Sequence, residues 1–177
     1  MNISATDIEG VFDIGLEPVK DERGFFARAY CWEEFARAGI DFTSTQINIS
    51  RNDAALTLRG MHWQAPPHAE AKLVRCLRGR IYDVVADIRA DSPTYRRWIG
   101  RELDAVSGNA LFVPEGCAHG FLTLEADCDV LYHMGRPYAP GKAAGFRFDD
   151  PAFAIAWPYE PKVIASADLA WAPYQDQ

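Results

Sequence analysis

The sequence lacks the features that mark several broad classes of protein. No segment approaches the roughly 18 consecutive apolar residues of a membrane-spanning helix. The first residues show no basic segment followed by an apolar run, so we expect no signal peptide. Basic residues are outnumbered, with 18 Lys and Arg against 25 Asp and Glu and a formal net charge of -7. This balance argues against a general nucleic-acid binder, which needs a basic face to displace counterions from phosphates.

Cysteine is scarce, and its spacing matches no redox or metal motif. The four cysteines lie far apart and form no Cys-x-x-Cys pair, so we expect free and mostly buried thiols. We therefore expect a cytoplasmic protein that binds neither membranes nor nucleic acid. A small phosphorylated ligand is compatible with the negative charge, because a few arginines in one pocket can outweigh a distant acidic surface. With 177 residues, 49% of them hydrophobic, the chain is expected to form one domain over residues 1–177.

Short strand-like segments make up most of the chain. Residues 45–50 (TQINIS) alternate apolar and polar side chains, which is typical of a half-buried strand, and a turn is expected at residues 51–53. Residues 78–79 (RG) separate two further segments and predict a hairpin between them. Only residues 32–38 (WEEFARA) have a helical composition, with Gly39 as the expected end of the helix. The other expected strands are residues 56–63, 72–77, 80–88, 110–113, 119–124 and 128–134.

Many short strands with one early helix predict an all-β protein, either an antiparallel sandwich or a barrel. The segment after Pro151 is rich in proline and tryptophan, so we expect an irregular C-terminal tail that packs across the β core. Small barrels often hold one ligand inside. Polar side chains that point inward are therefore the first candidates for a functional site.

The densest group of such residues is the run LRGMHWQ at residues 58–64. His62 and Gln64 share one face of an extended strand, since side chains alternate along it. Arg59 lies three positions before the histidine, and Lys72 follows on the next strand. A lone histidine is more often structural than catalytic, but the neighbouring cations favour a functional site.

A second group is the run PEGCAHGF at residues 114–121. A turn of this composition places His119 at the start of a strand. At that position the side chain would lie at the open end of a barrel, where it can take part in a functional site.

Taken in order along the chain, these and other motifs resemble the dTDP-4-dehydrorhamnose 3,5-epimerase family. The likeness covers nearly the whole sequence and rests on the runs DERGFF, LRGMHWQ, KLVR, DVVADIR with SPTY, VPEGCAHGF, LYHMGRPYAP, DDPAFAIAWP and SADL. The resemblance implies a cupin-type jelly roll with a short helix near the N-terminus. It also implies a homodimer that needs neither a metal nor another cofactor.

The implied activity is epimerisation at C3, C5 or both of a nucleotide-linked 4-keto-6-deoxyhexose, of the dTDP-4-dehydro-6-deoxyglucose type. The C4 ketone acidifies the hydrogens on both neighbouring carbons, so a base removes a proton from one face and an acid returns one to the other. By the match, His62 is the base, because an imidazole titrates near neutral pH. Asp168 matches the aspartate that holds this imidazole, as a carboxylate does in a hydrolase dyad. Tyr132 matches the proton donor.

The resemblance also assigns the substrate-binding residues by type. Two match positions beside the sugar, where a cation or N–H donor stabilises the C4 enolate oxygen. Two arginines match positions that hold the diphosphate. In this family an N-terminal segment crosses to the partner's pocket, so the first of these arginines is expected to act in trans. The assignments are Lys72 and His119 for the sugar, Arg23 and Arg59 for the diphosphate, Tyr138 for stacking on the nucleoside, and Gln46 and Asn48 for the pocket lining.

Four positions depart from the family pattern. Arg28 stands where the family usually has a glutamate, and Ala143 lies in a segment that usually carries another glutamate. Ala167 replaces a lysine beside Asp168, and Glu70 replaces a common glutamine. In the family the first three positions help to hold the nucleotide, so a change of charge there alters which groups can pair. We therefore keep Arg28 as a substrate-binding candidate and treat dTDP-, CDP-, GDP- and UDP-linked sugars as options.

Three alternative functions stay open at this point. The first is an epimerase that acts at only one carbon, on a CDP-, GDP- or UDP-linked keto sugar. The second is a metal-dependent cupin, for which the chain offers His62, Gln64, Glu70 and His119, although glutamine is a poor ligand for transition metals. The third is a non-catalytic sugar-nucleotide binder, against which the retained acid–base set argues.

Individual side chains also have structural alternatives. Tyr132 fits a core tyrosine, Asp168 fits a helix cap, and the diphosphate-binding arginines fit surface ion pairs. Asp83 lies on the same face as the pocket strands, where it either supports a histidine or serves a purely structural role. His68 and His133 lie outside the matched positions, and we expect both to be structural or exposed.

Overall fold

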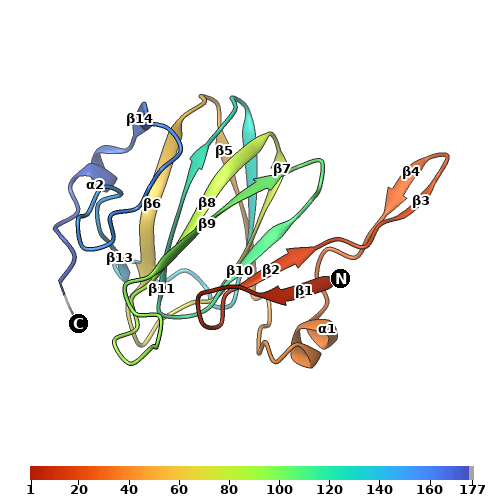
Figure 1. The fold of residues 1–177 in the computed structure, drawn as a ribbon, viewed down its shortest axis with the longest axis horizontal. Helices are drawn as coiled ribbons and strands as arrows, with labels where there is room; N and C mark the ends of the chain where they lie inside the picture. The colour runs from red at the N-terminus through yellow and green to blue at the C-terminus, as the bar shows by residue number, and fades with distance from the viewer. Residues whose placement is uncertain (176–177) are drawn as a thin grey trace.

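Two β-sheets packed face to face form the main body of the protein (Figure 1). The computed structural model describes residues 1–175, so the last two residues of the expected domain lie outside the described residues. One sheet has the strand order β1-β2-β10-β7-β12-β5, and the other has β13-β6-β11-β8-β9 with β14 beside β6. The elements are β1 (Asn2–Ala5), β2 (Phe12–Gly15), β3 (Val19–Asp21), β4 (Gly24–Phe26), α1 (Trp32–Arg37), β5 (Gln46–Asn52), β6 (Thr57–Gln64), β7 (Lys72–Arg78), β8 (Arg80–Asp87), β9 (Trp98–Asp104), β10 (Ala110–Val113), β11 (Cys117–Thr123), β12 (Cys128–Met134), β13 (Ala143–Gly145), β14 (Val163–Ile164) and α2 (Ser166–Leu169).

The all-β prediction is confirmed, and the expected strand segments locate most of the central strands. Two expected segments coincide with β10 and β12, and the others match β5, β6, β7, β8 and β11 to within two residues at either end. The turn expected at residues 51–53 begins later, because β5 runs to Asn52. The expected helix is α1, and Gly39 follows it with a φ of +80°. The sequence pattern does not predict the short or half-exposed strands β1 to β4, β9, β13 and β14.

The expected hairpin at residues 78–79 is wrong. Strand β7 pairs with β10 and β12, whereas β8 pairs with β9 and β11 in the opposite sheet. The physical reason is burial: Val74 and Cys76 of β7 pack face to face against Ile81 and Val85 of β8 in the core between the sheets. Gly79, with a φ of +75°, makes the corner that carries the chain from one sheet to the other.

The C-terminal segment packs across the outer face of the second sheet, as expected. Phe153 and Ile155 join Met61, Val84 and Phe146 in a separate hydrophobic cluster there. The segment is less irregular than predicted, because it contributes β14 and the short helix α2. This packing brings residues near the C-terminus beside β6.

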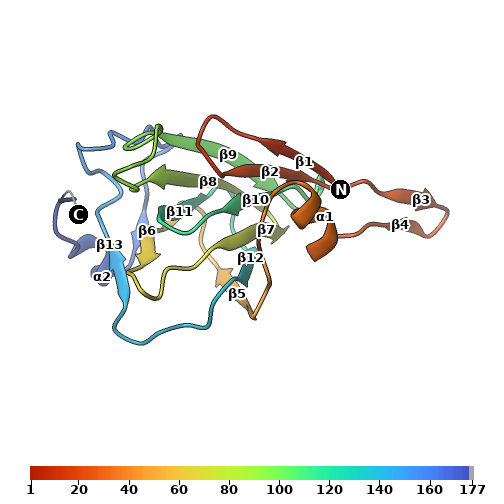
Figure 2. The same ribbon diagram turned by 90° about the horizontal axis from the view of Figure 1, so that it is seen from below.

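The hairpin formed by β3 and β4 projects away from the body, on the side opposite the C-terminal segment (Figures 1 and 2). Its apolar side chains Val19, Phe25 and Phe26 are exposed, Phe26 to 80%.

All four cysteines are free thiols, and three of them are buried. Among residues 1–175, no helix has the length and apolar character needed to cross a bilayer.

Candidate active site

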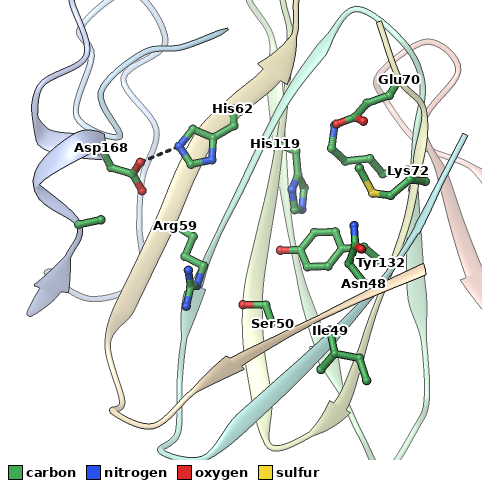
Figure 3. A pocket seen from close by; sticks show the side chains of 12 residues that line it. Asn48, Ile49, Ser50, Arg59, His62, Glu70, Lys72, His119, Tyr132 and Asp168 are labelled. Carbon is green, nitrogen blue, oxygen red and sulfur yellow. Dashed lines mark hydrogen bonds and ion pairs between the residues drawn. The ribbon is translucent and has the colours of Figure 1, made fainter. Parts of the chain in front are cut away.

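A cavity of about 390 Å³ opens between the two sheets, and polar side chains from both sheets line it (Figure 3). Strands β5, β7 and β12 supply one wall, strands β6 and β11 supply the other, and the segment around α2 closes one end. The lining residues are Asn48, Ile49, Ser50, Arg59, His62, Glu70, Lys72, His119, Tyr132, Met134, Ala165 and Asp168.

An irregularity in β6 explains how Arg59 and His62 both reach this cavity. Strict alternation would put two side chains three positions apart on opposite faces of a strand. However, His62 pairs with His119 and Arg59 pairs with Phe121, so three steps along β6 match only two along β11. One extra residue in β6 therefore makes a bulge that turns both side chains inward. Gly60 lies within the bulge, where an added Cβ would approach Gly120 Cα to 2.5 Å.

His62 is held by a carboxylate from the C-terminal segment. Its Nε2 lies 2.7 Å from Asp168 Oδ1, and Asp168 Oδ2 also accepts the backbone N–H of Gly60 at 3.4 Å. Among the described residues, Nδ1 of His62 has no hydrogen-bond partner, so this nitrogen is available to a ligand. The ring of Trp171 packs edge-on against the imidazole at a centroid distance of 6.0 Å.

A second histidine–aspartate pair lies beside the first and deeper in the protein. His119 Nε2 lies 2.8 Å from Asp83 Oδ1, and both side chains are buried. Burial raises the pKa of Asp83, and the neighbouring His119 opposes that rise. The histidine ring packs edge-on against Tyr132 with centroids 5.9 Å apart. Of the two roles left open for Asp83, the geometry therefore favours support of a histidine.

Tyr132 projects from β12, on the sheet opposite the one that carries His62 (Figure 3). Burial raises the pKa of its phenol well above the usual value, and the negative charge of Asp83 acts in the same direction. The positive charge of Arg59 acts in the opposite direction. The phenol therefore keeps its proton across the neutral range and is available as a donor.

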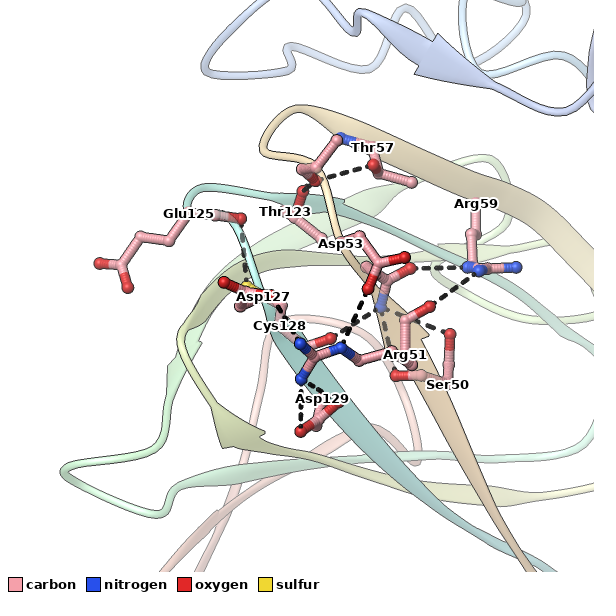
Figure 4. Close-up of polar contacts among 12 residues, drawn as sticks. Ser50, Arg51, Asp53, Thr57, Arg59, Thr123, Glu125, Asp127, Cys128 and Asp129 are labelled. Atoms are coloured by element: carbon pink, nitrogen blue, oxygen red, sulfur yellow. Dashed lines mark hydrogen bonds and ion pairs between the residues drawn. The ribbon is translucent and has the colours of Figure 1, made fainter.

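Arg59 is fixed at the rim of the cavity by its neighbours (Figure 4). Its Nε donates to Asn52 Oδ1 at 2.8 Å, and its Nη2 donates to the backbone oxygen of Arg51 at 3.3 Å. The Arg51 side chain instead forms ion pairs with three aspartates, two in the adjoining turns and one on β12. Arg59 has no carboxylate partner among the described residues, so its charge is available to an anionic ligand.

Four of the predicted site residues lie outside the cavity wall. Tyr138 lies in the loop after β12, where its backbone N–H donates to Gln46 Oε1 at 3.2 Å. Arg23, at the tip of the β3–β4 hairpin, pairs with Asp21, and Arg28 pairs with Glu34 at 2.6 Å. Gln46, Tyr138, Arg23 and Arg28 therefore do not line the cavity of their own chain.

Sequence reasoning missed several residues that line the cavity or contact a residue that lines it. Ser50 could have been found, because it lies two positions after Asn48 on a strand whose side chains alternate. Trp171 carries no local signal, since its contact with His62 arises only from the path of the C-terminal segment. Glu70 stands out in the sequence as a departure from the family pattern and as a candidate metal ligand, but nothing in the local sequence predicts its ion pair with Lys72.

The side chains named for the metal-binding alternative do not form one set of ligands in residues 1–175. His62 is bonded to Asp168, His119 to Asp83, and Glu70 to Lys72 and Gln64. Residues 1–175 contain no cluster of three or more His, Cys, Asp or Glu side chains with the geometry of a metal site. The candidate ligands thus point to different partners rather than to one common centre.

Comparison with known proteins gives consistent matches over nearly the whole chain. The sequence profile of the dTDP-4-dehydrorhamnose 3,5-epimerase family matches residues 5–176. The enzyme of that name from Sinorhizobium fredii is 42% identical to this chain, over 78% of this chain and 71% of the relative. The enzyme from Salmonella typhimurium is 38% identical, over 100% of this chain and 97% of the relative. The solved structure of the Bacillus anthracis enzyme with TDP and PPi bound has a TM-score of 0.94 at 32% identity, covering 98% of this chain and 99% of that one.

Proposed function

The chain belongs to the dTDP-4-dehydrorhamnose 3,5-epimerase family, and from that premise we propose that the cavity between the sheets is its active site. It is an isomerase that inverts C3, C5 or both in a nucleotide-linked 4-keto-6-deoxyhexose by acid–base proton exchange. One observation carries the assignment of the site. The His62–Asp168 pair lies on one side of the cavity, and the Tyr132 hydroxyl points inward from the other (Figure 3).

His62 is the proposed base. Asp168 accepts a hydrogen bond from Nε2, which leaves the lone pair of Nδ1 to remove a proton from the carbon beside the ketone. The same carboxylate then stabilises the imidazolium that forms. A solvent-accessible imidazole also exchanges its proton with water, so hydrogen from solvent enters the product.

Tyr132 is the proposed acid. It approaches the sugar from the sheet opposite His62, so a proton that it delivers reaches the other face of the enolate carbon. Delivery to the opposite face is what inverts the stereocentre. The raised pKa of this partly buried phenol ensures that the proton is present when the enolate forms.

The C4 oxygen becomes negative in the enolate, and a cation or an N–H donor in the cavity stabilises that charge. Lys72 on β7 and His119 on β11 are the proposed donors. Arg59 at the rim is the proposed partner of the diphosphate, because a guanidinium can donate two parallel hydrogen bonds to phosphate oxygens.

Proton exchange in D2O tests the proposed function directly. The enzyme is incubated with dTDP-4-dehydro-6-deoxyglucose, and the ring protons are followed by NMR. We expect deuterium at C3, at C5 or at both, together with the inverted sugar, and the pattern distinguishes a double epimerase from a single-site one. Binding of the sugar nucleotide without any exchange would support the non-catalytic alternative instead.

The nucleotide end of the site is tested separately. Of the three departures at nucleotide-holding positions, Ala143 lies on β13 and Ala167 on α2, whereas Arg28 lies between β4 and α1. Titration with dTDP, CDP, GDP and UDP measures whether these changes alter the base preference. A clear preference for dTDP would refute the hypothesis of an altered nucleotide.

We propose that the chain acts as a homodimer in which the β3–β4 hairpin reaches the partner's cavity. Two features support this arrangement: the hairpin exposes apolar side chains, and Arg23 at its tip lies outside the cavity of its own chain. Exposed Ile47 and Ile49 on the edge strand β5 provide a further apolar surface for a second copy.

Mixing two inactive variants tests whether Arg23 acts in trans. In a mixed dimer of Arg23→Ala and His62→Asn, one cavity receives an intact histidine from one subunit and an intact arginine from the other. We therefore expect activity to reappear on mixing. If both residues act within one chain, neither cavity is complete and mixing restores nothing.

We also propose one domain acting in the cytoplasm. Pairing of the first strands with the central ones and of β14 with β6 supports a single unit. Four free thiols support a reducing compartment, since disulfides form and persist in oxidising ones. Microscopy of the tagged protein tests the location, and one cooperative unfolding transition would support the single unit.

A further inference from the structure

The carboxylate of Glu70 forms a buried ion pair inside the cavity with the proposed oxyanion donor Lys72. Glu70 Oε1 lies 2.8 Å from Lys72 Nζ, and the two side chains are 7% and 8% exposed. Among the described residues the ammonium has no hydrogen bond of regular geometry, so the ion pair with Glu70 is its one polar contact. Glu70 is thus the single protein group that fixes the position of this charge before a substrate arrives.

A chain of hydrogen bonds behind Glu70 dictates what kind of group can occupy this position. The backbone N–H of Ala139 donates to Gln64 Oε1 at 2.7 Å, which fixes the orientation of the Gln64 amide. The Gln64 Nε2 must then face Glu70, and it donates to Glu70 Oε2 at 2.7 Å. Residue 70 therefore lies between two donors, the Gln64 amide on one side and the Lys72 ammonium on the other.

Two flanking donors require two acceptor oxygens, and only a carboxylate supplies both. A glutamine of the same shape would turn its own NH2 toward one of the donors. Because both neighbours are buried, the donor left without an acceptor would lose its hydration with nothing in exchange.

We propose that Glu70 is a positioning residue of the epimerase, which acts on the reaction through Lys72. It holds the ammonium where the C4 oxygen develops its charge, and it ties that ammonium through Gln64 to the loop that carries Tyr138. The inference rests on the proposed function, because it assigns Lys72 to the enolate oxygen.

A double-mutant cycle tests whether Glu70 acts through Lys72. We expect Glu70→Gln to lower kcat about 10- to 100-fold with little change in KM. This loss of kcat does not exceed the loss expected when an oxyanion donor itself is removed. In the Lys72→Met background the same substitution is expected to change kcat less than about twofold. An equal loss of kcat in both backgrounds would overturn the proposal. Glu102→Gln, which alters an exposed carboxylate paired with Arg80, is the matched control.

Exchange of the two side chains tests the donor–acceptor argument. In the variant Gln64→Glu/Glu70→Gln, the carboxylate introduced at position 64 accepts from the Ala139 backbone and from the new amide at position 70, whose oxygen then faces Lys72. Every donor again has an acceptor. We therefore expect the kcat of the exchanged variant to be at least tenfold higher than that of Glu70→Gln. An exchanged variant no more active than Glu70→Gln would count against the proposal.

A spectroscopic measurement separates this inference from the proposed function. The chain has only four lysines, Lys20, Lys72, Lys142 and Lys162, so their Cε signals can be resolved by NMR. A fixed Lys72 gives two distinct Hε shifts, and these are expected to merge in Glu70→Gln. Distinct shifts that persist would contradict the positioning role even if the enzyme were inactive on the sugar. Conversely, absence of proton exchange in the wild type would count against the proposed function alone.

Discussion

The two histidine–aspartate pairs of the cavity have the same chemistry but different surroundings. His62 and His119 are direct partners in the ladder between β6 and β11, so the pairs lie side by side. In the first pair the histidine side chain is 39% exposed, and its carboxylate comes from the C-terminal segment. In the second pair the exposures are 5% and 0%, and both groups belong to neighbouring core strands.

This difference separates a pair that can react from a pair that supports. A base must exchange its proton with solvent, and of the two histidines only His62 has a substantially exposed side chain. His119 instead packs against Tyr132, while the charge of Asp83 raises the pKa of that phenol. We therefore propose that the outer pair exchanges protons, whereas the inner pair positions Tyr132 and supplies a donor to the enolate oxygen.

Replacing the two histidines in turn tests the comparison most strongly. We expect His62→Asn to lower kcat by about 1,000-fold or more, since a general base contributes roughly that much, and to abolish deuterium exchange at carbon. His119→Asn is expected to cost about 100-fold, because it removes a donor to the enolate oxygen. Steady-state kinetics with dTDP binding as a control measures both effects. A larger loss for His119→Asn would reverse the assigned roles.

Tyr132→Phe distinguishes inversion from proton removal. Without the phenol no proton reaches the second face, so we expect epimerisation to fall about 100- to 1,000-fold. His62 can still remove the carbon proton and return a deuteron to the same face. Deuterium incorporation without inversion is therefore expected, and NMR in D2O detects it. Parallel loss of exchange and inversion would show that the phenol has another task.

The two aspartates provide a sharper form of the same comparison. Asp168→Asn is expected to lower kcat about 100-fold with little loss of stability, because the carboxylate acts on the exposed base. Asp83→Asn is expected to cost about tenfold in kcat, and its main effect is a lower midpoint of thermal unfolding, because both members of that pair are buried. Equal activity losses would remove the distinction between an outer and an inner pair.

Local pattern predicts the central strands of this fold, because their side chains alternate between the inner face of the sandwich, which holds both core and cavity, and the outer face. It does not predict which strands share a sheet: the expected hairpin fails at Gly79, where facing core residues separate β7 and β8. Nor does strict alternation place Arg59 in the cavity, since that orientation depends on the bulge at Gly60.

For the site, resemblance to a family predicts which residues take part, and this stays a prediction, whereas their contacts do not follow from local sequence. Asp168 reaches His62 across 106 positions, and no periodicity connects the two. The support of Lys72 by Glu70 depends on the orientation of the Gln64 amide, which a distant backbone N–H determines. Such contacts are set by tertiary packing and become visible only in three dimensions.

The smallest expected effect concerns Asp87, which lies on the same strand as Asp83 and is equally buried. Burial raises its pKa, but hydrogen bonds from Arg89, Ser92 and Thr94 outweigh that effect and lower the pKa to about 2. A carboxyl with a depressed pKa contributes stability above its unfolded pKa of about 4 and loses it as the pH falls toward 2. The pKa of Asp83, which lacks a comparable set of donors, is shifted upward instead.

Asp87→Asn should therefore destabilise the protein without affecting catalysis. We expect a loss of about 2 kcal/mol in the free energy of unfolding at pH 7, from a pKa shift of nearly two units. The difference between wild type and variant is expected to shrink between about pH 5 and pH 2, and urea unfolding at several pH values measures it. A constant difference over that range would mean that packing, rather than charge, carries the effect. In that case Asp87 would stabilise the protein through the fit of its side chain, and its contrast with the equally buried Asp83 would be one of shape and not of charge.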